Sequence, residues 1–456
     1  MKWIKHARPR ASQLTLALAG TAVLLAACSG GGGASKPESA AGPAQTNEAL
    51  QPKKREPVEL NIFCTCGWPK DTFDSRFGDT MRKKFPEYQI NYIQGSGEVT
   101  VTSLLTAGTK IDIVFESIMS QFSVLEQYKL ERDMTDLVKK HNVDLNRIEP
   151  ATIATIRNLS GGKLYAIPLV INTGMMYYNK SIFDKFGVAY PKNGMYWDEA
   201  IDLGKKINRT DGGLTYYGIG GAFEHIASIS PLRVSFIDSK NEKPTIQSDP
   251  NWRILYNMIT GIRQTTNNKS GAPETGMQSV SGINSFVKDQ RLGMYMYLVN
   301  TFLNDETSKL DWWDMASYPY HREAPGRGQQ PFATVFSVTS QSQHPDQAME
   351  VLAGMLTDDV QKGLAEIGTV PAVQSAEMMK LFGTKSAYAT KNLSAVFYNK
   401  MVENRHISKY DKGLLGIYQA AAVQDSLANG SLDLNTAFRQ IEENAVKNIA
   451  EEKAKQ

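Results

Sequence analysis

The sequence predicts an α/β fold of two lobes, and three observations support this prediction. From residue 57 onward, apolar runs typical of strands alternate with amphipathic segments typical of helices, which is the pattern of a sheet covered by helices. About 400 residues lie in this part of the chain, more than one hydrophobic core usually organises. Within it, no apolar run reaches the roughly 20 residues of a membrane-spanning helix.

The first 27 residues have the pattern of an export signal, with four basic residues, no acid and an apolar run from Leu14 to Ala27. Its end, LAAC at 25–28, resembles the bacterial lipobox, in which cleavage occurs before the cysteine and a lipid is attached to the thiol. We therefore expect a signal peptide at 1–27 and a palmitate-bearing lipoprotein, anchored through Cys28 to the extracellular face of the cell membrane. The alternative is an ordinary signal peptide with a chance cysteine.

Residues 28–56 are rich in Gly, Ser, Ala, Pro and Gln. A segment of this composition buries too little apolar surface to offset the entropy lost on ordering, so we expect a flexible, lipidated tether. The full chain has a net charge of +3, and loss of the four basic residues of the leader lowers the net charge to −1. Such a nearly neutral chain gives no electrostatic reason to expect nucleic-acid binding.

The beginning of the folded part predicts three layers with mainly parallel strands. Phe73, Phe77, Met81 and Phe85 recur at every fourth position, which predicts an amphipathic helix over 71–85 that ends before Pro86. Strand-like apolar runs flank this helix, and the alternation continues beyond it. The predicted order is strand 58–63, helix 71–85, strand 88–93, helix 99–107 and strand 111–115.

The later elements follow the same alternation. Asn179 is predicted to cap a helix over 181–186, Gly187 to end it, and Trp197 to be buried between the next helix and a sheet. The other predicted strands are 164–172, 174–178, 292–299 and 332–338. The other predicted helices are 197–207, 250–262, one that opens at Pro345, and 434–451.

Two cysteines, Cys64 and Cys66, remain once Cys28 is lipidated. Zinc needs further ligands that the neighbouring sequence lacks, and redox pairs use CxxC rather than CxC spacing. In an extended strand their Cα atoms would lie about 6.5–7 Å apart, at the outer limit for a disulfide, so we favour two packed thiols over a strained disulfide. The six histidines show no ligand spacing and no nucleotide-binding loop occurs, so we expect no metal and no cofactor.

Six segments between residues 111 and 373 resemble, in the same order, the family 1 extracellular solute-binding proteins of ABC importers, the maltose-binding type. The longest, GGKLYAIPLVINTGMMYYNKSIFDKFGV at 161–188, resembles the Ile-Pro and Tyr-Asn-Lys stretch of that family. In NGMYWDEAIDLGKKI at 193–207, Tyr196 replaces the usual threonine, so a different helix cap is expected. The remaining segments are IDIVFES (111–117), SFVKDQRLGMYMY (285–297), HPDQAMEVLAGML (344–356) and GTVPAV (368–373).

The resemblance implies a periplasmic-binding-protein-like (type II) α/β fold, with two lobes joined by hinge strands around an interlobe cleft. Lobe one would contain 57–172 and 333–372, and lobe two would contain 173–332 and 373–456. Open α/β sheets bind ligands at the carboxyl ends of their strands, and closure of a hinge then buries the ligand.

Eight residues follow strand ends or the first crossing between the lobes and are the predicted ligand contacts. Aromatic rings suit the apolar faces of a sugar, whereas amides and carboxylates suit its hydroxyls. For each residue the competing interpretation is a core, hinge or surface position. The predicted ligand-binding residues are Trp68, Glu116, Ser117, Asn172, Phe223, Glu224, Tyr297 and Asn300.

The resemblance implies a monomeric receptor that captures a carbohydrate, expected to be an oligosaccharide, and delivers it to the permease subunits of an ABC importer without catalysis. One alternative is the same fold binding a peptide, polyamine or phosphate ester, but strong anion binding would favour basic cleft residues, which the predicted set lacks. Another is a surface glycosidase, which needs two carboxylates about 5–10 Å apart. Glu116 and Glu224 are the predicted acids, and neither lies in a glycosidase motif.

Overall fold

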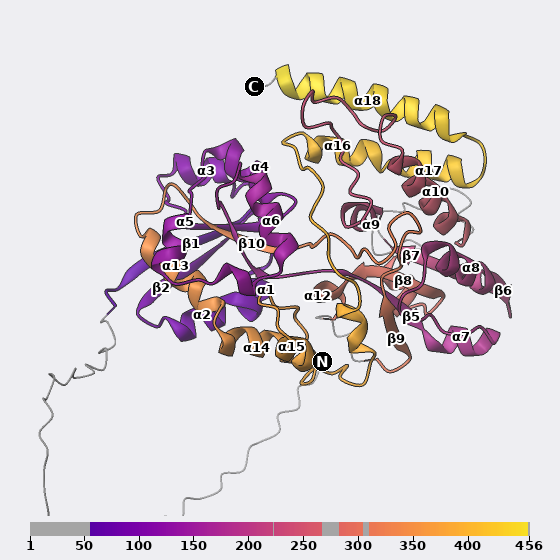
Figure 1. Cartoon of the computed structure of the whole chain (residues 1–456), viewed down its shortest axis with the longest axis horizontal. Coiled ribbons are helices and arrows are strands. Elements are labelled where there is room, and N and C mark those ends of the chain that lie inside the picture. Colours follow the sequence, from indigo (N-terminus) through magenta and orange to yellow (C-terminus); the bar gives the residue numbers. More distant parts are fainter. Residues whose placement is uncertain (1–54, 222, 267–281, 304–309, 455–456) are drawn as a thin grey trace, which may run out of the picture. The chain divides into compact units, whose positions relative to one another are not determined.

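A computed structural model describes residues 55–454, except 222, 267–281 and 304–309. The predicted signal peptide, Cys28 and nearly all of the predicted tether lie outside the described residues. Residues 55–456 form one compact unit, in which the described segments build two five-stranded sheets with helices around each (Figure 1). In these segments, no helix combines the length and the apolar character needed to cross a membrane.

The first sheet has the strand order β2-β1-β3-β10-β4. β1 pairs in parallel with β2 and β3, as predicted, but β10 runs antiparallel to β3 and β4. The expectation of mainly parallel pairing therefore fails beyond the first three strands, because β10 returns from the second sheet and enters in the opposite direction. The strands are β1 (Val58–Cys64), β2 (Tyr88–Gln94), β3 (Ile113–Ser117), β4 (Ile167–Val170) and β10 (Thr334–Val338).

A continuous helical stretch joins β1 to β2, where a single amphipathic helix was predicted. It consists of α1 (Lys70–Phe73), a π-helical turn η1 (Asp74–Gly78) and α2 (Asp79–Lys84). Phe77 packs on Phe115 and Phe336 of the sheet, with ring centroids 6.2 and 5.1 Å away. The other helices around this sheet are α3 (Val101–Thr106), α4 (Gln121–Tyr128), α5 (Thr135–Lys140), η2 (Leu145–Arg147), α6 (Pro150–Leu159), α13 (Pro345–Met355) and α14 (Asp358–Glu366).

The second sheet has the order β6-β7-β8-β5-β9 and is also mixed, with β7 and β8 parallel. Its strands are β5 (Gly174–Asn179), β6 (Arg209–Asp211), β7 (Leu214–Gly221), β8 (Leu292–Leu298) and β9 (Trp313–Ser317). Its helices include α7 (Lys180–Phe186), α8 (Trp197–Ile207), α9 (Phe223–Ser228), α10 (Asn251–Gln264), α11 (Ile283–Val287) and α12 (Val299–Phe302).

The helix ends around the second sheet follow the sequence closely. The Asn179 side chain accepts a hydrogen bond from the Ile182 amide at 3.2 Å, which confirms the predicted cap, and Gly187 ends α7 in the left-handed region. At α8, the carboxylate of Glu199 accepts from the amide of Tyr196 at 2.9 Å. This bond is half of a capping box, so the cap of α8 differs from a threonine cap, as expected.

Two segments cross between the sheets side by side. The chain passes from β4 to β5 through residues 171–173, and it returns from β9 to β10 through residues 318–333. The backbones of Asn172 and Phe332 exchange two hydrogen bonds, at 3.1 and 2.9 Å.

The C-terminal part covers both sheets in turn. α15 (Ala376–Leu381) packs against α14, and η4 (Leu393–Phe397) packs against β9. α16 (Asp411–Tyr418), α17 (Ala421–Ala428) and α18 (Leu434–Ala454) then lie beside α10 (Figure 1).

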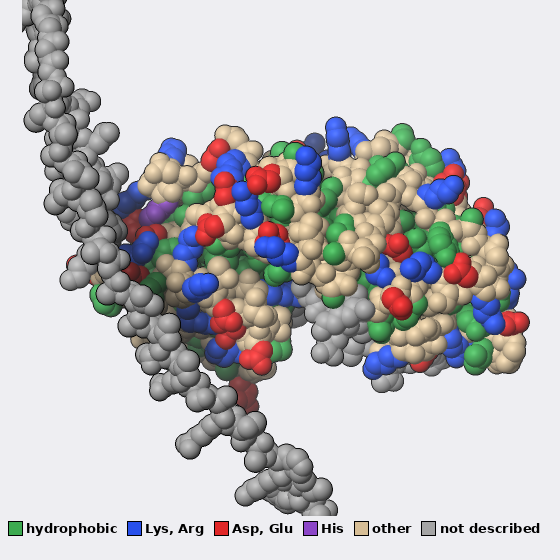
Figure 2. Space-filling view, turned by 90° about the horizontal axis from the view of Figure 1, so that it is seen from below, with side chains coloured by type: hydrophobic (Ala, Val, Ile, Leu, Met, Phe, Trp, Pro, Cys, Tyr) green, Lys and Arg blue, Asp and Glu red, His purple; other side chains and the backbone are tan. Residues whose placement is uncertain are grey.

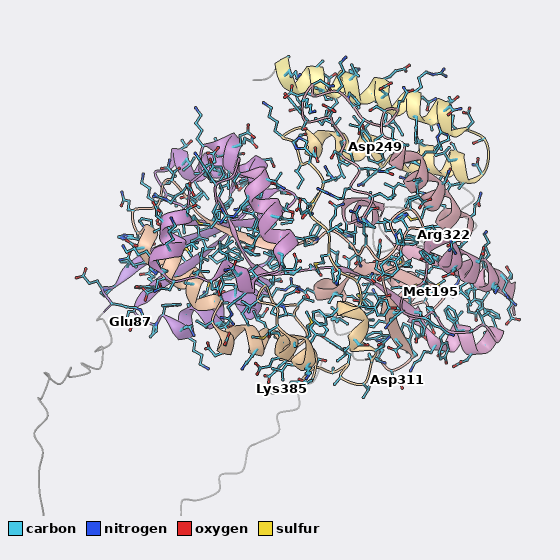
Figure 3. The ribbon with its side chains drawn as sticks, viewed as in Figure 1. Glu87, Met195, Asp249, Asp311, Arg322 and Lys385 are labelled. Carbon is cyan, nitrogen blue, oxygen red and sulfur yellow. A yellow bond between two sulfur atoms is a disulfide. The ribbon has the colours of Figure 1, made fainter. Side chains whose placement is uncertain are left out.

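Two large clusters of buried apolar side chains pack around the two sheets. One surrounds the first sheet and continues onto one face of the second through Tyr177 and Trp313, while the other covers the opposite face together with α8, α10 and α18. In Figure 3, Glu87 marks the side of the first sheet and Arg322 the side of the second. On the face seen in Figure 2, basic and acidic side chains are interspersed rather than gathered into a patch, as suits the nearly neutral charge.

Helix α8 approaches strand β7 closely enough to require glycine on both elements. A Cβ atom at Gly218 would lie 2.5 Å from the carbonyl oxygen of Gly204 and 2.6 Å from the Cβ of Thr265. The backbone there is also pinned, because the Gly218 amide donates to the carbonyl of Thr265 at 2.7 Å. The contact therefore has no flexible side chain that can yield.

We predict that Gly218→Ala lowers the free energy of unfolding by about 2–3 kcal/mol, because α8 must move away from the sheet. Urea unfolding of the purified protein measures the loss. Gly97→Ala is the control, since nothing lies within 4 Å of a Cβ at that position, and it should change stability by less than about 0.5 kcal/mol. Equal losses in the two variants would contradict the prediction.

Candidate functional site

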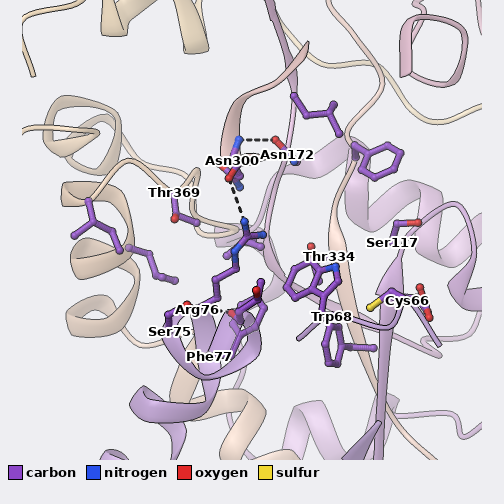
Figure 4. A pocket seen from close by; sticks show the side chains of 18 of the residues that line it. Cys66, Trp68, Ser75, Arg76, Phe77, Ser117, Asn172, Asn300, Thr334 and Thr369 are labelled. Atoms are coloured by element: carbon purple, nitrogen blue, oxygen red, sulfur yellow. Dashed lines mark hydrogen bonds between the residues drawn. The ribbon is translucent and has the colours of Figure 1, made fainter. Parts of the chain in front are cut away.

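A cavity of about 700 Å³ lies between the two sheets (Figure 4). Trp68, Glu116 and Thr334 line it from the side of the first sheet, and His225 and Asn300 line it from the side of the second. The other described lining residues are Cys66, Asp71, Thr72, Ser75, Arg76, Phe77, Phe115, Ser117, Val170, Asn172, Leu298, Phe332, Leu364, Ile367 and Thr369.

The direction of the parallel strands explains why the first sheet contributes polar groups here. β1 ends at Cys64 and β3 ends at Ser117, so the loops that follow both strands meet at one edge of the sheet. Backbone after a strand end is free of ladder hydrogen bonds and can present side chains to a ligand. Trp68, Glu116 and Ser117, which were predicted from this rule, are all brought to the cavity.

The loop after β1 is closed by a disulfide between Cys64 and Cys66, so the preference for two packed thiols was wrong. That preference assumed an extended strand through both residues. The strand instead ends at Cys64 and the chain turns, which brings the two Cα atoms to 5.2 Å. Donor atoms of Cys64, Cys66 and Glu116 lie within 4.8 Å of one another, but a disulfide has no thiolate to offer a metal.

Glu116 is buried at the base of this loop, with 5% of its surface exposed. Its Oε1 accepts a hydrogen bond from the hydroxyl of Thr65. Burial raises the pKa of Glu116, and the hydrogen bonds from Thr65, Cys66 and Ser117 only partly oppose the rise. Ser117 lies next to it, partly buried, at the wall of the cavity.

Trp68 lies at the cavity and also packs on the core. Its ring stacks parallel to Phe77 at 6.3 Å and meets Phe115 edge-on at 5.6 Å. The guanidinium of Arg76 lies over the ring, 4.7 Å from its centroid. The indole of Trp68 therefore both packs on the core and lines the cavity, and its contact with a ligand stays a prediction.

Asn172 and Asn300 line the cavity, but their amides also bind backbone groups (Figure 4). The Oδ1 of Asn172 accepts from the amides of Thr173 and Asn300, at 3.1 and 2.8 Å. Asn300 donates from Nδ2 to the carbonyl of Ile171 at 2.7 Å and accepts at Oδ1 from the amide of Val370 at 3.0 Å. These bonds join both halves of the molecule at the crossing.

The other three predicted contacts come from the second-sheet side. Tyr297, on β8, stacks on Tyr295 at 5.2 Å and meets the ring of His225 edge-on at 5.4 Å, but it is not among the described residues that line the cavity. α9 begins at Phe223 and contains Glu224, but the side chains of both residues lie outside the described part of the structure.

Several cavity residues were missed by the sequence analysis. Thr72 and Arg76 lie four positions apart in the helical stretch after β1, and both line the cavity. Their spacing was a usable signal, because a polar pair at i and i+4 shares a helix face. Ile367 and Thr369, after α14, reach the cavity through tertiary packing alone, and His225 does so from α9.

Comparison with known proteins shows a matching family and similar solved structures. Residues 69–362 match the family described as bacterial extracellular solute-binding protein. A sugar transporter from Rhizobium etli, in an open conformation, superimposes with a TM-score of 0.66 at 18% identity, over 85% of this chain and 99% of that one. This likeness confirms the predicted two-lobed fold.

Two further solved structures have a similar fold. The substrate-binding protein Lmo0181 from Listeria monocytogenes, in complex with cycloalternan, has a TM-score of 0.64 at 17% identity, over 87% of this chain and 100% of that one. The sugar-binding protein MalE from Xanthomonas citri has a TM-score of 0.65 at 14% identity, over 87% and 98% of the two chains.

The buried carboxyl group of Glu116 predicts a pH-dependent stability difference. Because its native pKa is raised above the unfolded value of 4.5, the native state keeps a proton that the unfolded chain releases, so stability falls as pH rises through this range. Glu116→Gln keeps an oxygen acceptor for Thr65. Because the amide cannot ionise, this variant does not lose stability through residue 116 as pH rises. We expect its Tm to rise relative to that of the wild type as pH increases from 4 to 8, in scanning calorimetry.

Glu126→Gln, at an exposed position of α4, is the control for that experiment. A difference between Glu116→Gln and the wild type that stays constant over the whole pH range would mean that ionisation of Glu116 does not weaken the fold.

Proposed function

This chain belongs to the bacterial extracellular solute-binding protein family, and from that premise we propose that it is a lipid-anchored receptor that captures a carbohydrate and delivers it to an ABC importer. The observation that carries the proposal is the cavity between the sheets. Its wall combines an indole ring, a buried carboxyl group, hydroxyls and amides at strand ends. Those groups match the apolar faces and the hydroxyls of a saccharide.

The size of the cavity favours a saccharide of more than one ring. A volume of about 700 Å³ lies in the upper part of the range of small-molecule sites. The Listeria protein of similar fold was solved with cycloalternan, an observation that concerns that protein. We propose an oligosaccharide as the ligand of this chain.

Closure of the two halves would work through the paired crossings. In this proposal lobe one is 57–172 with 333–372, lobe two is 173–332 with 373–456, and the backbone pair Asn172–Phe332 lies at the hinge. A ligand that contacts both lobes binds the closed form better, and it therefore populates closure in proportion to that difference in affinity.

We further propose that the receptor performs no chemistry and acts as a monomer. The members of its family are binding proteins rather than enzymes. Incubation of the purified protein with oligosaccharides, followed by chromatography, is expected to return the sugars uncleaved. Appearance of shorter products at a rate that depends on protein concentration would favour a glycosidase.

A thermal-shift screen over a saccharide panel tests the proposed function. A ligand at 100 times its Kd stabilises the folded state by about 2.7 kcal/mol. We predict that Trp68→Ala abolishes this shift and, because the ring also packs on Phe77 and Phe115, lowers the unliganded stability by about 2 kcal/mol.

Trp312→Ala is the matched control for Trp68→Ala. Trp312 is also partly buried and packs on Phe286 at 5.3 Å, but it does not line the described cavity. Its loss should lower the stability by a similar amount and leave the ligand-induced shift intact. Loss of the shift in both variants would mean that destabilisation, rather than a missing contact, explains Trp68→Ala.

The proposed anchor rests on the LAAC sequence at 25–28. We predict that Cys28→Ser moves the protein from the membrane fraction to the soluble fraction and abolishes labelling by radioactive palmitate, because the thiol that carries the lipid is gone. Labelling that survives in this variant would place the lipid elsewhere or remove the lipoprotein proposal.

A further inference from the structure

An arginine in the cleft lacks an acidic partner among the described residues. Arg76 belongs to the π-helical turn η1 and lines the cavity, with its guanidinium over the ring of Trp68 (Figure 4). Its Nη2 lies 3.4 Å from the carbonyl oxygen of Asn300, on the second-sheet side. Within the described part of the chain, no carboxylate oxygen forms an ion pair with it.

Three other arginines of this half, Arg55, Arg82 and Arg147, form ion pairs, whereas Arg132 and Arg157 donate to backbone carbonyls. Arg82, two turns further along the same helical stretch, binds Asp74 at 2.5 Å and Asp79 at 3.0 Å, and Arg55 binds Glu350 at 2.9 Å. Asp74 is only two residues from Arg76, yet it binds Lys70 and Arg82 instead. At this turn Asp74 therefore pairs with cations outside the described cavity lining, whereas Arg76 lines the cavity.

The guanidinium of Arg76 also has few hydrogen bonds. It carries five N–H donors, and one of them reaches a protein acceptor in the described residues, at a long distance. Burial lowers the pKa of Arg76, but a guanidinium stays charged at any physiological pH. The contact with Trp68 offsets part of this desolvation, because an aromatic face attracts a cation. Most of the donor capacity is left for a ligand.

The acid in the same cavity does not neutralise Arg76. Glu116 is held at the end of β3 by the hydroxyl of Thr65, and no ion pair joins it to Arg76. Asp71 also lines the cavity, at an exposed position of α1. The cavity thus has a cationic wall at η1 and a separate, hydroxyl-binding wall at the end of β3.

We propose that the ligand is an acidic saccharide, an oligosaccharide with uronic acid residues, whose carboxylate binds Arg76 while its sugar ring stacks on Trp68. The proposal rests on the function proposed above and names the substrate class of that same cavity. A planar guanidinium binds a planar carboxylate through two parallel hydrogen bonds, which a neutral sugar does not offer.

The position of Arg76 over Trp68 also disfavours a neutral sugar. A ring that stacks on this face of the indole must displace the guanidinium, which then loses its aromatic contact. A neutral sugar leaves the displaced charge with hydroxyl partners alone, whereas a uronate supplies a counter-ion together with the apolar face. Binding of the anion would also replace the long bond to the carbonyl of Asn300.

The test compares acidic and neutral forms of the same sugars. Trisaccharides of galacturonate, mannuronate and glucuronate, each with its methyl ester, are titrated into the purified protein by isothermal calorimetry, together with neutral and sulfated trisaccharides. We expect at least one uronate to bind, its methyl ester to bind about 10- to 100-fold more weakly, and the uronate affinity to fall as salt is raised.

Variants of Arg76 test whether this residue causes the preference for uronates. Arg76→Gln should weaken uronate binding by about 10- to 100-fold without weakening binding of the methyl ester, and Arg76→Lys should restore part of the loss. Arg82→Gln, in the same helical stretch but paired with Asp74 and Asp79, is the matched control and should change the uronate affinity less than threefold. The unliganded Tm of each variant shows that it folds.

Three outcomes overturn the inference in distinguishable ways. Neutral trisaccharides or methyl esters that bind as tightly as the uronates would refute the acidic ligand and leave the receptor function standing. Binding restricted to sulfated sugars would refute the proposal that Arg76 binds a carboxylate. Absence of binding by every saccharide would overturn the proposed function, and the inference with it.

Discussion

The pairing of two backbone segments between the sheets is the constraint on which the rest of the site depends. Asn172 and Phe332 exchange their amide and carbonyl bonds, so the outgoing and the returning chain cross at one place. Beside this crossing lies the cavity, bounded by strand ends on one side and by α9 and α12 on the other. In the proposed closure, a rotation about this crossing would change the cavity, and it would also have to accommodate the apolar cluster that continues from the first sheet onto the second.

The amide side chains at this crossing illustrate how one residue serves two purposes. Asn172 and Asn300 face the cavity, yet each uses its side chain to bind backbone groups of residues 171–173, 300 and 370. An irregular crossing has no ladder to satisfy its amides and carbonyls, and a buried backbone group without a partner is costly. The amides meet that need and hold the crossing in register. A ligand contact through Oδ1 of Asn172, or through either polar atom of the Asn300 side chain, would share an atom already engaged with the backbone.

The cavity holds Glu116 and Arg76 apart, and neither forms an ion pair among the described residues. Burial raises the pKa of Glu116, and Arg76 lies over the ring of Trp68. A chain selected for stability alone would pair these groups or replace them with apolar residues. The spare N–H donors of Arg76 suit a ligand site, because unused donors are groups that a ligand can bind. The disulfide between Cys64 and Cys66 closes the loop that carries Thr65 to this carboxyl group.

Local patterns in the sequence determined most of the elements and part of the site. Strand ends at Ser117 and Cys64 and the cap at Asn179 are decided by neighbouring residues, so alternation and capping rules located them, and with them Trp68 and Glu116. The tertiary structure alone decided which side of the helix after β1 faces the second sheet, and so placed Arg76 in the cavity. It also decided the antiparallel entry of β10, the turn that joins Cys64 to Cys66, and the contribution of α14 to the wall. The helix orientation, the entry of β10 and the contribution of α14 arise from contacts between segments far apart in the chain, which no local period records. The turn at Cys64 and Cys66 is local, but the assumption of an extended strand through both residues hid it.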